Sequence, residues 1–348
     1  MADAFVKPPP LRRGDRVAVT SSSWGGPHAL PAPYDAGLAV LRDELGLEVV
    51  EARTARMPAD ELARNPRLRA ETMNELFADD SVHAIIASIG GDDSVRILPW
   101  LDTELALTHP KIVLGYSDTD TQLVAYHLAG LVTYNGPAVM SGFAQMGTFR
   151  DSLEHVRAML FGEAGAGTPL PAFENWTQTN SDWADPARAT EIVGLELHDG
   201  WRWLGAERTT RGRLFGGCID VLEFLKGTRW WPNADPSWWR GRVLFLETSE
   251  EKPPLDTVRY WLRNYGSQGV FEHAEALWFG RARGYSDAEN EQLYALLVDV
   301  VRDAGGDLPI VANLDFGHTD PHWVLPLGVE VETDPEARTL TLCESATA

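Results

Sequence analysis

The segment Lys111-Ile-Val-Leu-Gly-Tyr-Ser-Asp-Thr-Asp120 predicts a strand, a sharp turn and a helix in direct succession. Its apolar run stops at Gly115, Ser117 follows two positions later, and residues 121–131 have a helical pattern. In an α/β protein, such a turn presents a serine hydroxyl at the carboxyl end of the sheet, where helix-terminal N–H groups can stabilise an oxyanion. Because Asp118 and Thr119 replace the usual x-Gly after the serine, the residues also fit a simple helix N-cap. Ser117 is therefore a candidate nucleophile that requires partners elsewhere.

Short apolar strands alternate with helical segments on both sides of this motif. We expect strands at 15–20, 48–52, 83–88, 111–114 and 132–134, and helices at 34–45, 60–78, 95–101 and 121–131. Such alternation is typical of βαβ units. It predicts an α/β fold whose N-terminal part is an open, Rossmann-like parallel sheet flanked by helices, with its site at the carboxyl ends of the strands.

The composition changes near Gly162-Glu-Ala-Gly-Ala-Gly-Thr-Pro-Leu-Pro171, which is the best candidate for a linker. We therefore predict an α/β domain at residues 1–165 and a β-rich, mixed C-terminal domain at 166–348. The second part begins with a tryptophan-rich stretch. Beyond it, strands are expected at 210–215, 241–247, 276–279 and 308–313, and helices at 255–265 and 287–301.

Composition excludes several classes of function. The 348 residues, 44% of them hydrophobic, can bury a large core, and this length predicts two domains. The formal net charge of -21 argues against a nucleic-acid partner, which would require a basic face. Two cysteines give neither a disulfide framework nor a Cys-based zinc site. Because no secretory leader or membrane-spanning stretch is apparent, we expect a cytoplasmic protein that does not associate with membranes.

A serine nucleophile needs a base, and the base needs an orienting carboxylate. Glu247 ends the apolar strand Arg242-Val-Leu-Phe-Leu-Glu247, and His318 lies in the turn-rich loop Gly317-His-Thr-Asp-Pro-His322. Each residue alone also fits a role without function: Glu247 as an exposed acid at a strand end, and His318 as an ordinary loop histidine. His318 and His322 have the i, i+4 spacing of a metal pair, but that spacing converges only on a helix, and Pro321 argues against one.

These signals occur in blocks whose order resembles that of the serine LD-carboxypeptidase family, and within it the microcin immunity branch. The blocks are Gly14-Asp-Arg-Val-Ala-Val, Ser88-Ile-Gly-Gly-Asp-Asp-Ser94, Gly115-Tyr-Ser-Asp118, Gly212-Arg-Leu-Phe-Gly-Gly217, Leu244-Phe-Leu-Glu247 and Gly317-His-Thr-Asp-Pro321. The resemblance implies a Ser-Glu-His triad of Ser117, Glu247 and His318. It also implies an oxyanion hole formed by the backbone N–H groups of Gly91 and Asp118, and a homodimer. No metal or other cofactor is expected.

The Gly-Gly-Asp-Asp-Ser form resembles the immunity branch, whose members cleave an amide between an aminoacyl group and a modified nucleotide. An aromatic side chain stacks on the base in that branch, and Trp183, followed by Trp176, is our candidate for it. Asp93 is a further candidate substrate contact. The branch usually has asparagine at the position of Cys218. We therefore expect a peptidyl- or aminoacyl-nucleotide amidase. A murein tetrapeptide carboxypeptidase acting on short peptides and a non-catalytic binding protein are the alternatives.

Overall fold

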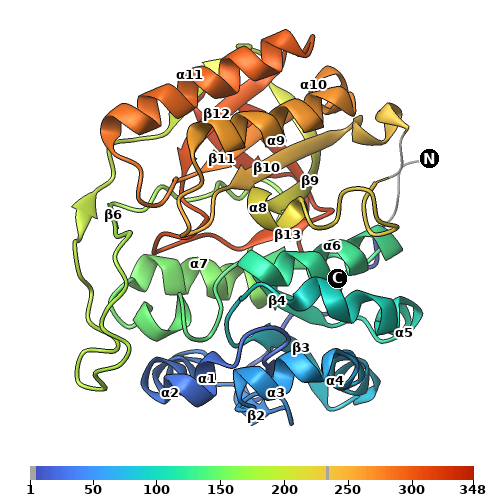
Figure 1. Cartoon of the computed structure of the whole chain (residues 1–348), viewed down its shortest axis with the longest axis vertical. Helices are drawn as coiled ribbons and strands as arrows, with labels where there is room; N and C mark the ends of the chain where they lie inside the picture. Colours follow the sequence, from blue (N-terminus) through green and yellow to red (C-terminus); the bar gives the residue numbers. More distant parts are fainter. Residues whose placement is uncertain (1–4, 233–234) are drawn as a thin grey trace.

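The computed structural model describes residues 5–232 and 235–348. Two sheets form the framework of these residues, and helices pack against both of them (Figure 1). The strands are β1 (Arg16–Thr20), β2 (Glu48–Glu51), β3 (Val82–Ala87), β4 (Ile112–Gly115), β5 (Thr133–Asn135), β6 (Asn175–Trp176), β7 (Glu196–Leu197), β8 (Arg202–Gly205), β9 (Thr210–Cys218), β10 (Arg242–Glu247), β11 (Ala276–Gly280), β12 (Pro309–Leu314), β13 (Leu325–Leu327), β14 (Glu330–Asp334) and β15 (Thr339–Leu342).

The helices include short 3₁₀ and π segments, which carry the label η. They are α1 (Gly26–Ala29), α2 (Pro31–Ala39), η1 (Val40–Glu44), α3 (Ala59–Arg64), α4 (Pro66–Ala78), η2 (Ser94–Trp100), α5 (Thr103–Thr108), η3 (Ser117–Thr119), α6 (Asp120–Ala129), η4 (Phe143–Gln145), α7 (Arg150–Leu160), α8 (Ile219–Leu222), η5 (Pro236–Trp239), α9 (Leu255–Ser267), α10 (Val270–His273) and α11 (Asp287–Asp303). None of the described helices is long and apolar enough to cross a membrane.

The first sheet has the strand order β13-β5-β4-β3-β1-β2. Strands β1 to β5 pair in parallel, as the alternation of apolar and helical segments predicts. The central strand β4 is buried along its whole length, which explains its uninterrupted apolar sequence. The sixth strand, β13, comes from near the end of the chain and pairs antiparallel with β5. The chain therefore returns to the first sheet at β13 before its last two strands join the second sheet.

The second sheet has the order β15-β14-β9-β10-β11-β12-β8. Its centre, β9 to β12, is parallel, and the outer strands β14, β15 and β8 are antiparallel. Helices α9 and α11 pack against each other on this half of the molecule (Figure 1). The α/β fold with a parallel first sheet and a mixed second sheet is thus confirmed.

Several local elements differ from the expected ones. The helix expected at 34–45 is split into α2 and a π-helical turn, η1, and the helix expected at 95–101 is the 3₁₀ segment η2, which contains Pro99. A proline inside a helix lacks the N–H that a continuous α-helix requires, so the tighter form is physically reasonable. Helix α7 and strands β13 to β15 had no predicted counterpart.

Candidate active site

Ser117 lies at the turn between β4 and α6. Its backbone φ of 61° is in the left-handed region, which a non-glycine residue adopts only when its surroundings enforce it. A Cβ atom on Gly90 would lie 2.9 Å from the Ser117 Cβ and 3.0 Å from its Oγ, so glycine is required there to leave room for the hydroxyl. The strained turn presents Oγ to a cavity, as the strand-turn-helix sequence predicts.

His318 follows β12 and approaches Ser117 from the second sheet. Its Nε2 lies 3.0 Å from the Ser117 Oγ, and its Nδ1 lies 2.8 Å from Oε2 of Glu247, the last residue of β10. All three side chains are buried. Gly317, at φ 109°, lets the loop pass close to Glu247, because a Cβ there would lie 3.0 Å from Oε2. The structure therefore brings together the serine, base and acid that the sequence placed at three strand ends.

A fourth group contacts the imidazole. Oε2 of Glu250 lies 3.0 Å from the same Nε2 atom that faces Ser117, and the Glu250 side chain is 51% exposed. Burial by itself lowers the pKa of His318, but the carboxylates of Glu247 and Glu250 outweigh it and raise the pKa to about 10. The hydrogen bond to the imidazole lowers the pKa of Glu250 to about 2. In this arrangement the imidazolium form is favoured, and Glu250 competes with Ser117 for Nε2.

The loop after β3 packs directly against the serine turn and lines the same cavity. Gly91 has φ 144°, lines the cavity, and its N–H donates to no acceptor among the described residues. The Asp118 carboxylate accepts hydrogen bonds from the N–H groups of Asp93 at 3.0 Å and Ser94 at 2.8 Å, which ties this loop to the serine turn. Gly91 therefore lines the same cavity as Ser117, and Asp118 directly follows the serine in the chain.

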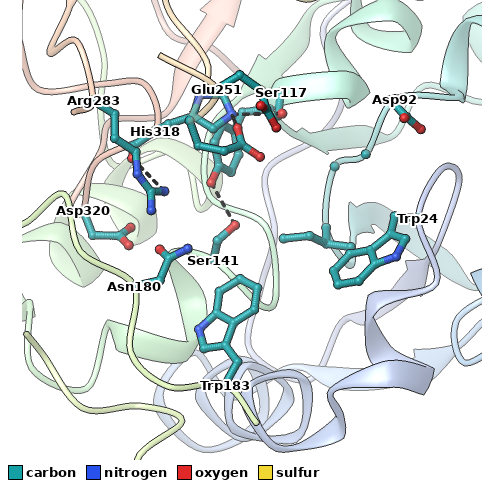
Figure 2. Close-up of a pocket in the computed structure, with 15 residues that line it drawn as sticks. Trp24, Asp92, Ser117, Ser141, Asn180, Trp183, Glu251, Arg283, His318 and Asp320 are labelled. Carbon is teal, nitrogen blue, oxygen red and sulfur yellow. Dashed lines mark hydrogen bonds and ion pairs between the residues drawn. The ribbon is translucent and has the colours of Figure 1, made fainter. Parts of the chain in front are cut away.

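The cavity in front of Ser117 has a volume of about 340 Å³ (Figure 2). The described residues that line it are Trp24, Ile89, Gly90, Gly91, Asp92, Tyr116, Ser117, Ser141, Asn180, Trp183, Glu250, Glu251, Arg283, His318 and Asp320. Trp183 is partly buried, and its indole N–H has no hydrogen-bond partner among the described residues. Such a wall can bind a ring together with a polar or charged group.

Two sequence candidates lie outside this cavity. Trp176 lines a separate cavity of about 250 Å³, where the Arg281 guanidinium is centred 5.3 Å from its ring. The Asp93 carboxylate is paired with Arg69 at 2.5 Å and Arg96 at 3.1 Å, and the neighbouring Asp92 lines the cavity instead. The structure does not bring Trp176 or the Asp93 carboxylate to Ser117.

The region behind the triad contains the one group of potential metal ligands found among the described residues. Cys218, Glu247 and His318 have polar atoms within 4.8 Å of one another, and the parallel register sets Cys218 beside Glu247. Burial raises the pKa of the Cys218 thiol and so disfavours the thiolate that binds metals. His318 and His322, the other pair considered from the sequence, both pack against the Tyr116 ring, and burial lowers the pKa of His322 to about 3.

Comparison with protein families agrees with this geometry. The model for the LD-carboxypeptidase N-terminal domain matches residues 17–136, and the model for the C-terminal domain matches residues 211–333. This chain belongs to the LD-carboxypeptidase family. The predicted family is therefore confirmed, and with it the prediction of a serine hydrolase.

Individual members of the LD-carboxypeptidase family match over almost the whole chain. A putative carboxypeptidase of Vibrio cholerae is 28% identical, with 95% of this chain and 96% of that protein covered. The microcin C7 self-immunity protein MccF of Escherichia coli is 26% identical, with 96% and 95% covered. A structure of MccF in complex with glutamyl sulfamoyl guanosine superposes with a TM-score of 0.85 at 25% identity, covering 99% of this chain and 100% of that one.

Sequence reasoning missed several polar residues of this LD-carboxypeptidase cavity. Trp24 follows β1, Glu250 and Glu251 follow β10, Arg283 follows β11, and Asp320 follows β12. Each lies a few residues beyond the carboxyl end of a parallel strand, the edge at which α/β proteins bind ligands. That position is the signal that could have found them, although it does not distinguish them from other loop residues.

Proposed function

We propose that Ser117, His318 and Glu247 form the catalytic triad of an amidase. Ser117 Oγ attacks the amide carbonyl carbon while His318 Nε2 takes its proton, and the Glu247 carboxylate stabilises the resulting imidazolium through Nδ1–H. The N–H groups of Gly91 and Asp118 stabilise the negative oxygen of the tetrahedral intermediate. The imidazolium returns its proton to the leaving amine, and water then hydrolyses the acyl-enzyme by the same steps. The 3.0 and 2.8 Å contacts of His318 support this assignment.

We further infer that the amide joins an aminoacyl or peptidyl group to a modified nucleotide. The observation that carries this inference is Trp183, an aromatic side chain on the wall of the same cavity of about 340 Å³ that Ser117 lines (Figure 2). The similarity to MccF, solved with glutamyl sulfamoyl guanosine, supports it. A murein tetrapeptide is the alternative substrate, because the chain belongs to the LD-carboxypeptidase family.

Assays with aspartyl sulfamoyl adenosine and with a murein tetrapeptide distinguish these two substrates. Stacking of a base on an aromatic ring contributes roughly 1–3 kcal/mol, so Trp183→Ala should lower kcat/KM on the nucleotide substrate by about tenfold to a hundredfold. Residual activity on the peptide should be unaffected. Trp176→Ala is the matched control, since Trp176 lies in the other cavity. Equal losses on both substrates, together with a lower Tm, would show that Trp183 only packs against the core.

A further inference from the structure

Arg283 is the one lysine or arginine among the described residues that line the cavity. It follows β11 by three residues, in a loop that also contains Arg281. The two side chains have different surroundings. Arg281 is buried and donates to Asp315 at 2.7 Å, to the Thr319 hydroxyl at 3.2 Å and to the Pro321 carbonyl at 3.0 Å. Arg281 therefore has a structural role, with its donors already used inside the protein.

The Arg283 guanidinium, in contrast, has most of its donors available. Its one hydrogen bond to a described residue is long, 3.5 Å from Nη1 to the carbonyl oxygen of His318, and it forms no ion pair with a described carboxylate. The side chain is only partly buried and lies on the same side of the cavity as Asp320 and Asn180 (Figure 2). A guanidinium has five N–H donors in a planar fork, which suits a carboxylate or another oxyanion.

Asp320 and Glu250 are acidic neighbours of this guanidinium, and Asp320 is the more deeply buried of the two. The backbones of Asp320 and Thr177 exchange two N–H to carbonyl hydrogen bonds, of 2.7 and 2.9 Å, and these fix the loop. The Asp320 carboxylate lines the cavity and has no hydrogen bond or ion pair with a described side chain. Burial raises the pKa of Asp320 to about 6, although Arg283, Arg281 and His318 oppose this effect. An ionised Asp320 would repel an anion bound at Arg283, because like charges at close range disfavour each other.

We propose that Arg283 binds an anionic group of the substrate and that Asp320 tunes the strength of that binding. The proposal rests on hydrolysis at Ser117 and specifies the substrate chemistry further. A carboxypeptidase substrate ends in a free carboxylate, and an aminoacyl nucleotide of the sulfamoyl or phosphate type has an anionic linker. Both present an oxyanion to the cavity, and in both cases Arg283 is the available cation.

Binding to the Ser117→Ala variant tests this without turnover. Calorimetry would compare three ligands: a murein tetrapeptide, the same peptide with a C-terminal carboxamide, and aspartyl sulfamoyl adenosine. Because Arg283→Gln removes a hydrogen-bonded charge pair, we expect it to weaken the binding of the anionic ligand by about tenfold to a hundredfold. Arg283→Lys should weaken it less, because it keeps the charge and loses the fork. The carboxamide peptide should bind weakly and be insensitive to Arg283→Gln if the terminal carboxylate is the group bound.

Asp320→Asn should have the opposite effect and increase the affinity for the same anionic ligand by a few-fold near pH 7. A merely structural role of Asp320 would not produce this increase. Arg302→Gln is the control, since Arg302 is an exposed arginine on α11.

The ligand whose affinity responds to Arg283→Gln identifies the anionic group. If only the affinity for the tetrapeptide falls, the site binds a terminal carboxylate. If only the affinity for aspartyl sulfamoyl adenosine falls, the site binds the anionic linker. If the nucleotide does not bind and the peptide responds, the proposed nucleotide substrate fails and the anion site stands. Equal affinities with and without the Arg283 guanidinium for every ligand, or no binding of any, would overturn the proposal.

Discussion

Replacing Glu250 by glutamine should make the enzyme more active at neutral pH. Glu250 lies 3.0 Å from His318 Nε2, the atom that must accept the Ser117 proton. While the imidazole is protonated and paired with Glu250, it cannot act as a base. Removing the carboxylate charge removes one of the two acids that raise the pKa of His318 to about 10. The pKa of the imidazole should therefore fall, and the neutral base should be more abundant at pH 7.

The size of this effect follows from the exposure of Glu250. Two unit charges about 3 Å apart attract by roughly 1.4 kcal/mol in a water-like dielectric. Because the Glu250 side chain is 51% exposed, solvent screens the pair, and we take about 0.7–1.4 kcal/mol as the interaction energy between the two charges. One pKa unit corresponds to about 1.36 kcal/mol, so the pKa should fall by about 0.5–1 unit. Glu247 remains in place, and its contact with Nδ1 keeps the pKa elevated.

The pH dependence of kcat/KM measures this shift, because it reports the ionisation of the free enzyme. Activity requires neutral His318, so kcat/KM rises as the pH increases through the pKa of the imidazole. In Glu250→Gln this acid limb should move to lower pH by about 0.5–1 unit, which increases kcat/KM about threefold to tenfold at a pH well below the pKa. Glu251→Gln is the matched control. It removes the same charge from the next residue, which also lines the cavity but forms no hydrogen bond or ion pair with the His318 side chain.

An unchanged acid limb in Glu250→Gln would refute this reasoning, as would an equal shift in Glu251→Gln. Either result would mean that the contact seen at Nε2 does not control the protonation of the base. A uniform fall in kcat/KM at all pH values would instead give Glu250 a role in substrate binding.

Three further predictions concern the triad, the loop facing it and metals. Ser117→Ala and His318→Ala should each lower kcat by roughly 10⁴–10⁶-fold and the double variant no further, with Glu247→Ala costing less; near-normal turnover by Ser117→Ala would contradict the assignment. Gly90→Ala should lower kcat with little change in Tm, because its Cβ would lie 2.9 Å from the Ser117 Cβ, and a Tm loss of the size seen in a core variant would contradict a local effect. A chelator should leave activity unchanged and elemental analysis should find no stoichiometric zinc; a loss that added zinc restores would exclude the serine mechanism.

Much of the site could be predicted because parallel strands have a simple geometry. Ser117, Glu247 and His318 each follow an apolar run, and the carboxyl ends of parallel strands meet along one edge. Two such edges, from β4 in one sheet and from β10 and β12 in the other, come together in the structure. The sequence pattern predicts the strand ends, and the resemblance to a family predicts which of the polar residues there meet.

Beyond the triad, Gly91 and Trp183, the cavity residues could not be predicted because tertiary contacts position them. Trp176 and Trp183 belong to the same irregular stretch, and no apolar period distinguishes them. Two antiparallel bridges separate their environments: β6 pairs Trp176 with Glu196 on β7, and Thr177 pairs with Asp320 in the loop of His318. Beyond that second bridge the chain turns toward the cavity and Trp183 lines its wall. Thr177 and Asp320 are far apart in the sequence, and local propensities do not encode such a pairing. Which of the two tryptophans lines the cavity therefore depends on how the loop of His318 folds against the tryptophan-rich segment.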